Sequence, residues 1–475
     1  MLLFFLFETA TLLFAAGTLS FLVHTVEKLT AFDFAVCILL IKLTLASAIP
    51  MTLGFFRQLD TRAIVVSSII LSAMGAWALG QNSASLVQAQ LFLHASYAAL
   101  DPLTGIIILL TLSSLAPLFI SNIGRVNEWD TAFSIKYAID WLKKKTTPYT
   151  MDFEYSSYWE CRLSVPLLCQ REFGDSRALL VFAQLEPLVL FWFATVSIAT
   201  HLGIPPYLSL LLGWHSIAIQ NFWGEACGLT NIKNDIIYNS GILTVVLGAL
   251  LLFQEQNQIS LSNQAVPVIF ISLGAAFALT KYSAIALLPA MAVLSIFAAY
   301  LSQGYDKAAT VIMAFGYAAA AACLLSGHFY LKNWIKFGSP LYPVRITTGV
   351  VNLPGIYDLR GTSILETALN RDTRNKTIRH LIGKHEFKGP MMFPLGIAWI
   401  GTIVLTAMYA SLVPAFALAG DISHINWSTW LVAAISTVSF LAYLGSFGSS
   451  SSWGNPGDLF HMNRLHFNKV CHSQP

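Results

Sequence analysis

The sequence predicts an all-α, polytopic membrane protein with about twelve transmembrane helices and two long loops on one face. Hydrophobic residues make up 56% of the chain and charged residues only 11%, whereas about a quarter of the residues of a soluble chain are charged. Many apolar segments reach roughly 18 residues, which is enough to cross a hydrocarbon core of about 30 Å as a helix. No alternating barrel pattern appears, and in lipid only helices or closed barrels satisfy the backbone.

The apolar segments define the expected helices in chain order. Their ranges are 2–23, 34–55, 63–79, 101–121, 178–200, 204–220, 237–253, 266–280, 283–301, 309–331, 391–411 and 427–446. The stretch 84–100 is compatible with an interfacial helix or with part of another crossing. The first segment contains Glu8 and has no basic leader, so we expect a retained helix rather than a cleaved signal peptide.

Two connections are too long to be simple turns, namely residues 122–177 and 332–390, and loops of this length are usually functional. The first contains "DTAFSIKYAIDWLKKK". Its apolar residues are spaced as in a short amphipathic helix lying on the bilayer. These residues are Phe133, Tyr137, Ile139, Trp141 and Leu142. The alternative is a solvated helix without a specific role.

Alternation of the helices across the membrane brings the unusual polar segments together. From the fourth helix onward, five polar segments are predicted to emerge on one face. They are the loop with Asp130, the segment ending at Asp235, the turn with Lys281, the loop 332–390 and the C-terminal tail. The opposite face receives only plain polar turns such as "GIPP", "QEQNQISLSNQ" and "SQGYDK". We therefore expect one membrane domain, residues 1–475, with its polar site at one surface.

The charge distribution leaves the orientation open. Most of the 27 lysines and arginines lie on the polar face, which the positive-inside rule would make cytoplasmic. That rule is weakest for long loops, which carry most of these charges. Basic side chains also suit a site for an anionic lipid headgroup.

Four motifs carry a family resemblance. In chain order they are "VNEWDTAFSIKYAIDWL", "LTNIKNDIIYNSGILTVVLGALLL", "LGAAFALTKYSAIALLPAMAVL" and "GHFYLKNWIKFGSPLYPV". They resemble the loop Asp, the Asn-Asp pair, the Thr-Lys-Tyr turn and the Arg/Lys-Asn-x-x-x-x-Gly-x-Pro-x-Tyr-Pro element of the GT-C superfamily of membrane glycosyltransferases, in particular its bacterial mannosyltransferase and family 39-like members. The resemblance covers roughly residues 120–345.

The resemblance implies a GT-C-like fold and transfer of a hexose or pentose from a polyprenyl-phosphate sugar donor to an acceptor that the sequence does not identify. It implies a location in the bacterial inner membrane, with the active face extracytoplasmic and the lipid bilayer as a partner. Nucleic acid is not an expected partner, because the net charge is only +3 and no basic motif is present.

The chain departs from the family pattern in two places. Many bacterial relatives carry a Tyr-His pair shortly after the loop Asp, where this chain has Ser134 and Ile135. A histidine role is therefore in doubt. The segment "WGNPGDLFHMNRLHF" leads in relatives to another membrane helix, so we expect a C-terminus truncated relative to the family.

Asp130 is the candidate catalytic residue. Sugar transfer needs a carboxylate within hydrogen-bond reach of the acceptor, to take its proton as the anomeric carbon is attacked. Displacement of the phosphate through one base inverts the anomeric centre, as in inverting glycosidases. The alternative for Asp130 is the N-cap of a helix that starts at Thr131.

The leaving phosphate requires nearby cations. Lys281 at a helix junction is the first candidate, with Arg345 and Arg360 behind it. The alternative for Lys281 is snorkelling to the interface. Asp235 either orients this lysine or caps its own helix at Ile236, and the cap is the favoured reading.

Three further residues complete the candidate substrate site, and the cofactor remains open. Glu128 is either an auxiliary acid or an exposed surface charge. Asn333 and Tyr342 belong to the fourth motif, where shaping the loop is the favoured role. No cofactor is required by the sequence. A divalent metal among Asp130, Glu128 and Asp235 is an open alternative.

Two other functions compete with the transferase. A polysaccharide polymerase or ligase would use Arg and His instead of Asp130. A transporter or lipid flippase is favoured by Glu8, Lys42, Glu186 and His215, which lie within predicted helices and are costly in hydrocarbon. Against transport, no inverted pair of interrupted helices is found. The sequence alone does not pair these charges.

Overall fold

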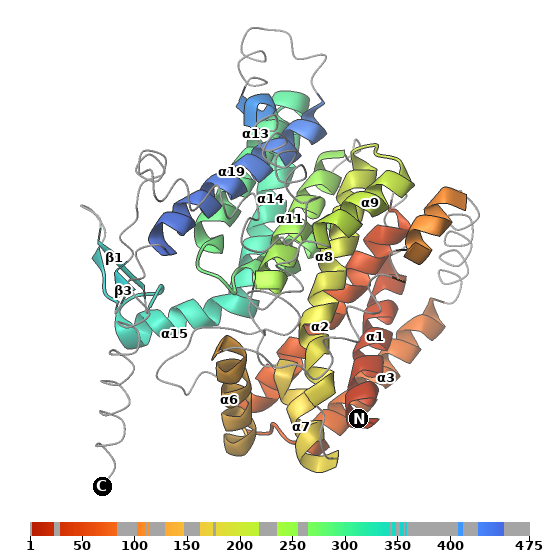
Figure 1. The fold of residues 1–475 in the computed structure, drawn as a ribbon, viewed down its shortest axis with the longest axis vertical. Coiled ribbons are helices and arrows are strands. Elements are labelled where there is room, and N and C mark those ends of the chain that lie inside the picture. The colour runs from red at the N-terminus through yellow and green to blue at the C-terminus, as the bar shows by residue number, and fades with distance from the viewer. Residues whose placement is uncertain are drawn as a thin grey trace, which may run out of the picture. The chain divides into compact units, whose positions relative to one another are not determined.

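The structure, a computed structural model, shows a largely helical chain with a few short strands (Figure 1). The residues that it describes are 2–22, 29–82, 102–110, 113, 129–146, 162–173, 177–217, 235–254, 265–342, 344–347, 352–355, 357–358, 407–411 and 426–450. Two compact units are present. Unit 1 comprises Met1–Lys332 and Ala419–Val432, and unit 2 comprises Asn333–Leu418 and Ala433–Pro475.

The helices follow the apolar segments of the sequence. They are α1 (Leu2–Leu22), α2 (Ala31–Phe55), α3 (Thr61–Gln81), α6 (Trp129–Lys144), α7 (Ser164–Phe173), α8 (Phe182–His201), α9 (Pro206–Ile217), α11 (Asp235–Gln254), α12 (Ala265–Ala278), α13 (Ala284–Gln303), α14 (Tyr305–Ala322), α15 (His328–Phe337) and α19 (Trp427–Ser450). A 3₁₀ turn, η4 (Arg177–Val181), precedes α8, and a π-helical turn, η5 (Cys323–Gly327), joins α14 to α15.

Seven helical segments in the described part of the chain are long and apolar enough to cross a membrane. They are Leu2–Leu22, Ala31–Phe55, Thr61–Gln81, Leu179–His201, Ile236–Gln254, Ala284–Gln303 and Tyr305–Phe337. The prediction of an α-helical membrane protein is therefore supported, but the count of twelve crossings is not confirmed. Helices α9 and α12 have only 12 and 14 residues, and the predicted helices 101–121 and 391–411 lie largely outside the described residues.

Side-chain caps fix where two of the membrane helices begin. Thr30 and Asp33 form a capping box at the start of α2, so this helix begins three residues before the predicted position. Asp60 caps α3, because its carboxylate accepts a hydrogen bond of 3.0 Å from the backbone of Ala63. That hydrogen bond and an ion pair with Lys145 lower the pKa of Asp60.

Helices α1 and α3 pack backbone to backbone at two glycines. A Cβ atom on Gly75 would lie 2.6 Å from the backbone of Leu13, and one on Gly17 would lie 2.9 Å from the carbonyl oxygen of Gly75. Such close approach of membrane helices is favoured by small residues, since lipid provides no hydrophobic force that drives helices together. The crossing therefore depends on these two positions lacking side chains.

We expect Gly75→Ala to separate α1 from α3 and to lower the free energy of unfolding by about 1–3 kcal/mol, the usual cost of overpacking. Gly80→Ala in the same helix is the matched control, because no atom lies within 4 Å of a Cβ there. Denaturation in mixed micelles measures both variants. Equal stability of the two variants would contradict the close crossing.

Hydrogen bonds show which helix ends lie together in the second half of unit 1. Helices α8 and α11 run parallel, because Ser240 donates to the Pro187 carbonyl (2.7 Å) near both starts and Gln254 donates to the His201 carbonyl (2.8 Å) at both ends. Helix α12 packs extensively on α11 and returns to the starting end of this pair. At this end of α12, the hydroxyl of Tyr330 in α15 donates to the Leu279 carbonyl at 2.5 Å. The turn after α13 lies at the opposite end.

Unit 2 contains a small sheet inside the second long loop, for which no regular element is predicted from the sequence. Its strands are β1 (Val344–Thr347), β2 (Asn352–Leu353) and β3 (Tyr357–Asp358), in the order β2-β1-β3. Strand β1 pairs antiparallel with β2 and parallel with β3.

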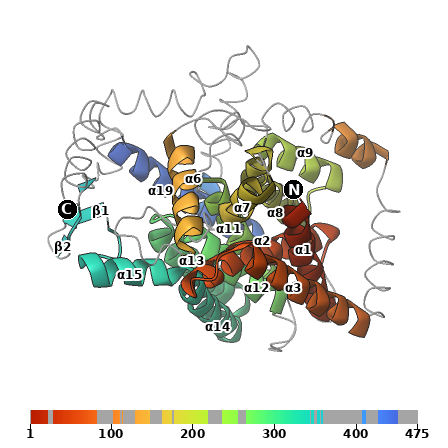
Figure 2. The same ribbon diagram turned by 90° about the horizontal axis from the view of Figure 1, so that it is seen from below.

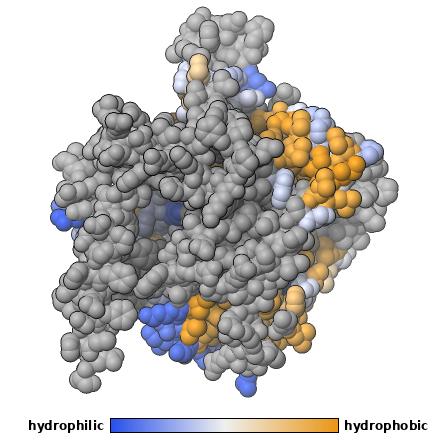
Figure 3. Space-filling view, in the orientation of Figure 1, coloured by the Kyte–Doolittle hydropathy of each residue, from blue (hydrophilic) through white to orange (hydrophobic). Residues whose placement is uncertain are grey.

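Hydrophobic side chains cover much of the described surface, as expected for helices that contact lipid. Leu208, Leu211 and Leu212 of α9 are exposed, and Figure 3 shows a hydrophobic surface in the region of this helix. The chain is an integral membrane protein by the length and composition of its helices.

Candidate functional site

The candidate base Asp130 lies in the first turn of α6, which begins at Trp129. The N-cap alternative, with a helix starting at Thr131, is therefore wrong by two residues. An acidic residue in a first helical turn complements the positive end of the helix dipole. The orientation of the Asp130 side chain lies outside the described part of the structure, as does Glu128.

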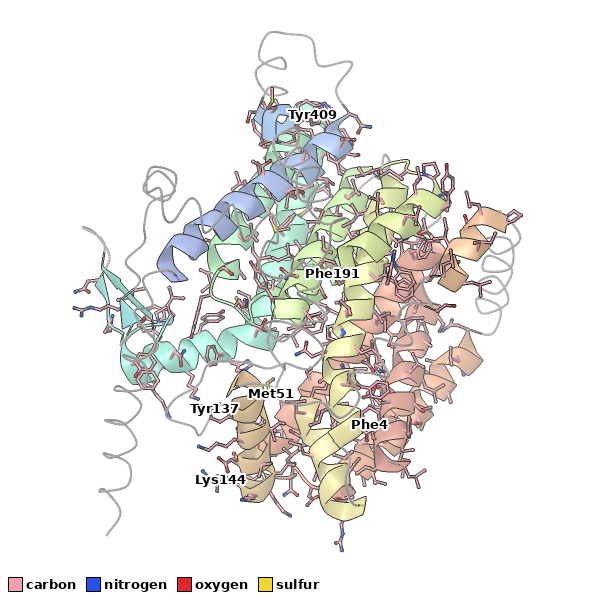
Figure 4. All side chains as sticks on the ribbon, in the orientation of Figure 1. Phe4, Met51, Tyr137, Lys144, Phe191 and Tyr409 are labelled. Atoms are coloured by element: carbon pink, nitrogen blue, oxygen red, sulfur yellow. The ribbon has the colours of Figure 1, made fainter. Side chains whose placement is uncertain are left out.

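Helix α6 is held against the end of the bundle by one buried face. Ala138, Trp141 and Leu142 are buried at helical spacing and belong to one hydrophobic cluster with Phe4 at the start of α1 and Leu180 before α8. The amphipathic helix predicted in this loop is present and these residues contact protein, while its position on the bilayer stays a prediction. Figures 2 and 4 show α6 beside α7, with Lys144 at the lower end of α6 in Figure 4.

The second candidate region joins α11 and α12. Lys281 lies in the turn between α12 and α13, with its ammonium 5.5 Å from the centre of the Tyr238 ring. Tyr238 stands three residues after Asp235, the first residue of α11, so both residues lie in the first turns of this helix. Whether Asp235 caps this helix or orients Lys281 stays a prediction. The Asp235 side chain is not among those described.

The starts of α1, α8 and α11 lie at the same end of the bundle. Helix α6 packs where α1 and α8 begin, α8 and α11 run parallel, and Lys281 contacts the first turns of α11. Helix α6, the start of α11 and the Lys281 turn therefore belong to the same end of the bundle, while a common membrane face for Asp130, Asp235 and Lys281 stays a prediction.

The remaining predicted site residues belong to unit 2. Asn333 is buried and donates through its amide to the Tyr342 carbonyl at 3.0 Å. The Tyr342 ring stacks on Phe337 with centres 3.9 Å apart. These contacts shape the exit of α15, which is the role the sequence favoured. Arg345 is exposed in β1 and lines a hollow with Asn352, Pro354 and Gly355, while Arg360 lies outside the described residues.

Four buried charges meet inside unit 1 and form what we term the four-charge cluster: Glu8 of α1, Lys42 of α2, Arg162 before α7 and Glu186 of α8. The Lys42 ammonium pairs with Glu8 and, at 2.6 Å, with Glu186. Arg162 pairs with Glu186 and, at 3.4 Å, with Glu8. Each charge thus has two partners of opposite sign, and the cluster has a formal charge of zero.

The four-charge cluster lies deep between the membrane helices. Lys42 is near the middle of the 25-residue helix α2, roughly 17 Å from its nearer end at 1.5 Å per residue. Charges at this depth require pairing. The sequence identified Glu8, Lys42 and Glu186 as costly charges within predicted helices but did not pair them, and it did not single out Arg162.

A second polar cluster lies where α2 begins and α8 ends. The Asp33 carboxylate accepts a hydrogen bond from the Ser197 hydroxyl, and the His201 Nε2 atom lies 2.9 Å from its second oxygen. Ser, His and Asp also form hydrolase triads, but there the histidine must contact the serine. Here both Ser197 and His201 contact Asp33, which also belongs to the α2 capping box, so the cluster joins two helix ends.

Among the described residues, no group of three His, Cys, Asp or Glu side chains is arranged to hold a metal ion. The carboxylates of Asp130, Glu128 and Asp235 are not among these residues, so the alternative of a divalent metal there stays a prediction. Comparison of the chain with protein-family models, curated proteins and solved structures finds no match.

Proposed function

We propose that the chain is a glycosyltransferase that moves a hexose or pentose from a polyprenyl-phosphate donor to an acceptor at one membrane surface. The observation that supports the proposal is the convergence of three helix ends. Asp130 and Lys281 are more than 100 residues apart, yet α6 packs where α8 begins, α11 begins beside α8, and Lys281 contacts the first turns of α11.

The chemistry assigns a role to each charge. The acceptor oxygen or nitrogen attacks the anomeric carbon while the bond from that carbon to the phosphate oxygen breaks. Asp130 takes the acceptor proton, and the polyprenyl phosphate leaves with the bonding electron pair. Lys281 compensates the charge of the phosphate, and Asp235 orients the lysine. Inversion at the anomeric carbon follows from a single displacement.

The proposal also assigns the membrane face at which the reaction takes place. The four sequence motifs resemble GT-C transferases, whose reaction takes place at the extracytoplasmic face, so we assign this end of the bundle to that face of a bacterial inner membrane. Lipid phosphate would reach Lys281 from the leaflet, because this residue stands in a turn at the end of two apolar helices.

Donor binding tests the role of Lys281 without knowledge of the acceptor. We expect purified protein in nanodiscs to bind a tritiated polyprenyl-phosphate hexose or pentose, and Lys281→Met to raise the dissociation constant roughly 10- to 100-fold, as expected for a hydrogen bond to a charged group. Lys281→Arg should retain most of the affinity. Lys307→Met, at the opposite end of the bundle, is the control.

Absence of binding by the wild-type protein across hexose and pentose donors would overturn the proposal. Equal affinity of Lys281→Met and Lys307→Met would remove Lys281 from the donor site. Inversion is checked separately, by comparing the anomeric configuration of donor and product.

A second candidate function, proton-coupled or lipid transport, is favoured by the four-charge cluster. Carboxylates that exchange protons inside a membrane domain are a common feature of transporters. In such a cycle Glu8 and Glu186 would have to separate from Lys42 and Arg162, whereas a transferase keeps them paired. Flux across proteoliposomes that contain the wild-type protein, without sugar transfer by the same protein, would favour transport.

A further inference from the structure

The segment that contains α14 and α15 is too long to lie wholly in the hydrocarbon core. It runs for 33 residues from Tyr305 to Phe337, about 50 Å at 1.5 Å per residue, against a core of about 30 Å. Residues 305–327 alone span about 35 Å. The last part of the segment, α15, must therefore leave the core.

The chain changes direction where α14 ends. The π-helical turn Cys323–Gly327 interrupts the regular hydrogen bonding, and such turns are a recognised cause of helix kinks. Ser326 in this turn donates to the Ala276 carbonyl at 2.7 Å, which fixes the turn against α12.

Helix α15 has an exposed apolar face and an inward face on its opposite side, and two lysines. One face holds apolar side chains at helical spacing, with Leu331, Trp334 and Ile335 exposed by 56%, 62% and 77%. The opposite face is turned inward, where Phe329 and Asn333 are buried. Lys332 lies on the border between these faces, and Lys336, one turn further on, is exposed beside the inward face.

We propose that α15 lies in the plane of the membrane and binds the anionic headgroup layer of the leaflet in which the protein is embedded. Leu331, Trp334 and Ile335 enter the leaflet, while Lys332 and Lys336 contact lipid phosphates. An apolar face bordered by lysines is the pattern of interfacial helices, and tryptophan is enriched at this depth. This inference holds whether or not the chain transfers sugar.

The arrangement also sets the depth of the candidate site. Tyr330 in α15 donates to the carbonyl of Leu279, two residues before Lys281, and its ring contacts Tyr282, the residue after Lys281. A helix anchored at headgroup level therefore keeps the Lys281 turn at the level of lipid phosphates.

Spin labels along α15 test the proposal in the full chain. Single cysteines replace residues 331, 332, 334, 335 and 336 in a variant whose native cysteines are changed to serine or alanine. We expect collisions with lipid-soluble oxygen to exceed those with a water-soluble nickel complex several-fold at 331, 334 and 335, and the reverse at 332 and 336. Equal water exposure at all five positions would overturn the proposal and leave the face for a protein partner.

The lipid charge is tested by nanodisc composition. With a label at 335, phosphatidylglycerol should increase the immersion relative to phosphatidylcholine alone, and the combined change Lys332→Gln and Lys336→Gln should abolish the increase. Lys307→Gln at the far end of α14 removes one charge without this effect. A depth that is independent of phosphatidylglycerol overturns recognition of anionic headgroups.

Brominated phosphatidylglycerol provides a readout that keeps the native cysteines. Bromine quenches tryptophan fluorescence over a short range, and the described face contains a single tryptophan, Trp334. We expect part of the quenching to disappear in Trp334→Phe. Quenching unchanged by this substitution would place Trp334 outside the leaflet and overturn the proposal.

Discussion

Glu186→Gln is expected to lower the free energy of unfolding by about 3–5 kcal/mol, the cost of removing one partner from a buried ion pair. The substitution leaves Lys42 and Arg162 facing Glu8 alone, with one uncompensated positive charge between membrane helices. Both basic side chains are at least nine-tenths buried, so water cannot replace the lost carboxylate. Denaturation in mixed micelles measures the loss.

Two comparisons identify charge balance as the cause. The double variant Glu186→Gln and Arg162→Gln restores a neutral cluster, so we expect it to lose less stability than the sum of the two single variants. Lys145→Gln breaks the ion pair with Asp60, whose side chains are 54% and 31% exposed, and should cost about 0–1 kcal/mol. Additive losses in the double variant would contradict a coupled cluster.

The membrane helices of the first half were predictable because hydropathy alone determines them. The predicted range 2–23 agrees with α1 within one residue, whereas the start of α2 moved from 34 to Ala31. Thr30 and Asp33 form a capping pattern that is visible in the sequence, so the earlier start of α2 could have been predicted. The predicted range 309–331 did not show the π-helical turn Cys323–Gly327 that separates α14 from α15, because hydropathy does not indicate such an interruption.

Side-chain partners were harder to predict than helices. Lys42 and Glu186 are 144 positions apart, and no local pattern connects them. Arg162 appeared as one of several basic residues in a long loop, because its burial arises only when α7 packs on α1. The protein contacts of the α6 apolar face were not predicted for the same reason, since an amphipathic pattern does not distinguish lipid from protein.

The membrane face of the candidate site stays a prediction, because it rests on a count of helices of which seven are long and apolar enough to cross a membrane in the described part of the chain. Counting helices placed Asp130, Asp235 and Lys281 on one face, and the described contacts bring their helix ends to one end of the bundle. The contact between Lys281 and Tyr238 was not predicted, although Tyr238 stands three residues after Asp235. This contact forms only because α11 and α12 pack together, and the sequence does not show that packing.

Asp130→Asn is expected to reduce sugar transfer by about 10²- to 10⁴-fold, the usual contribution of a general base, with little change in donor affinity. The substitution keeps the size of the side chain but removes the carboxylate that accepts the proton of the acceptor. Single-turnover transfer from a tritiated polyprenyl-phosphate sugar, measured beside donor binding, separates this chemical step from binding.

Asp140→Asn is the matched control, because Asp140 belongs to the same helix α6 but lies roughly 15 Å further along it. Equal loss in both variants would indicate a defect of the helix rather than of the reaction. Full activity of Asp130→Asn would exclude this carboxylate as the base. Loss confined to Asp130→Asn, with donor still bound and the protein still folded, requires a carboxylate at the first turn of α6, because an amide there cannot take up the proton that the attacking acceptor must release.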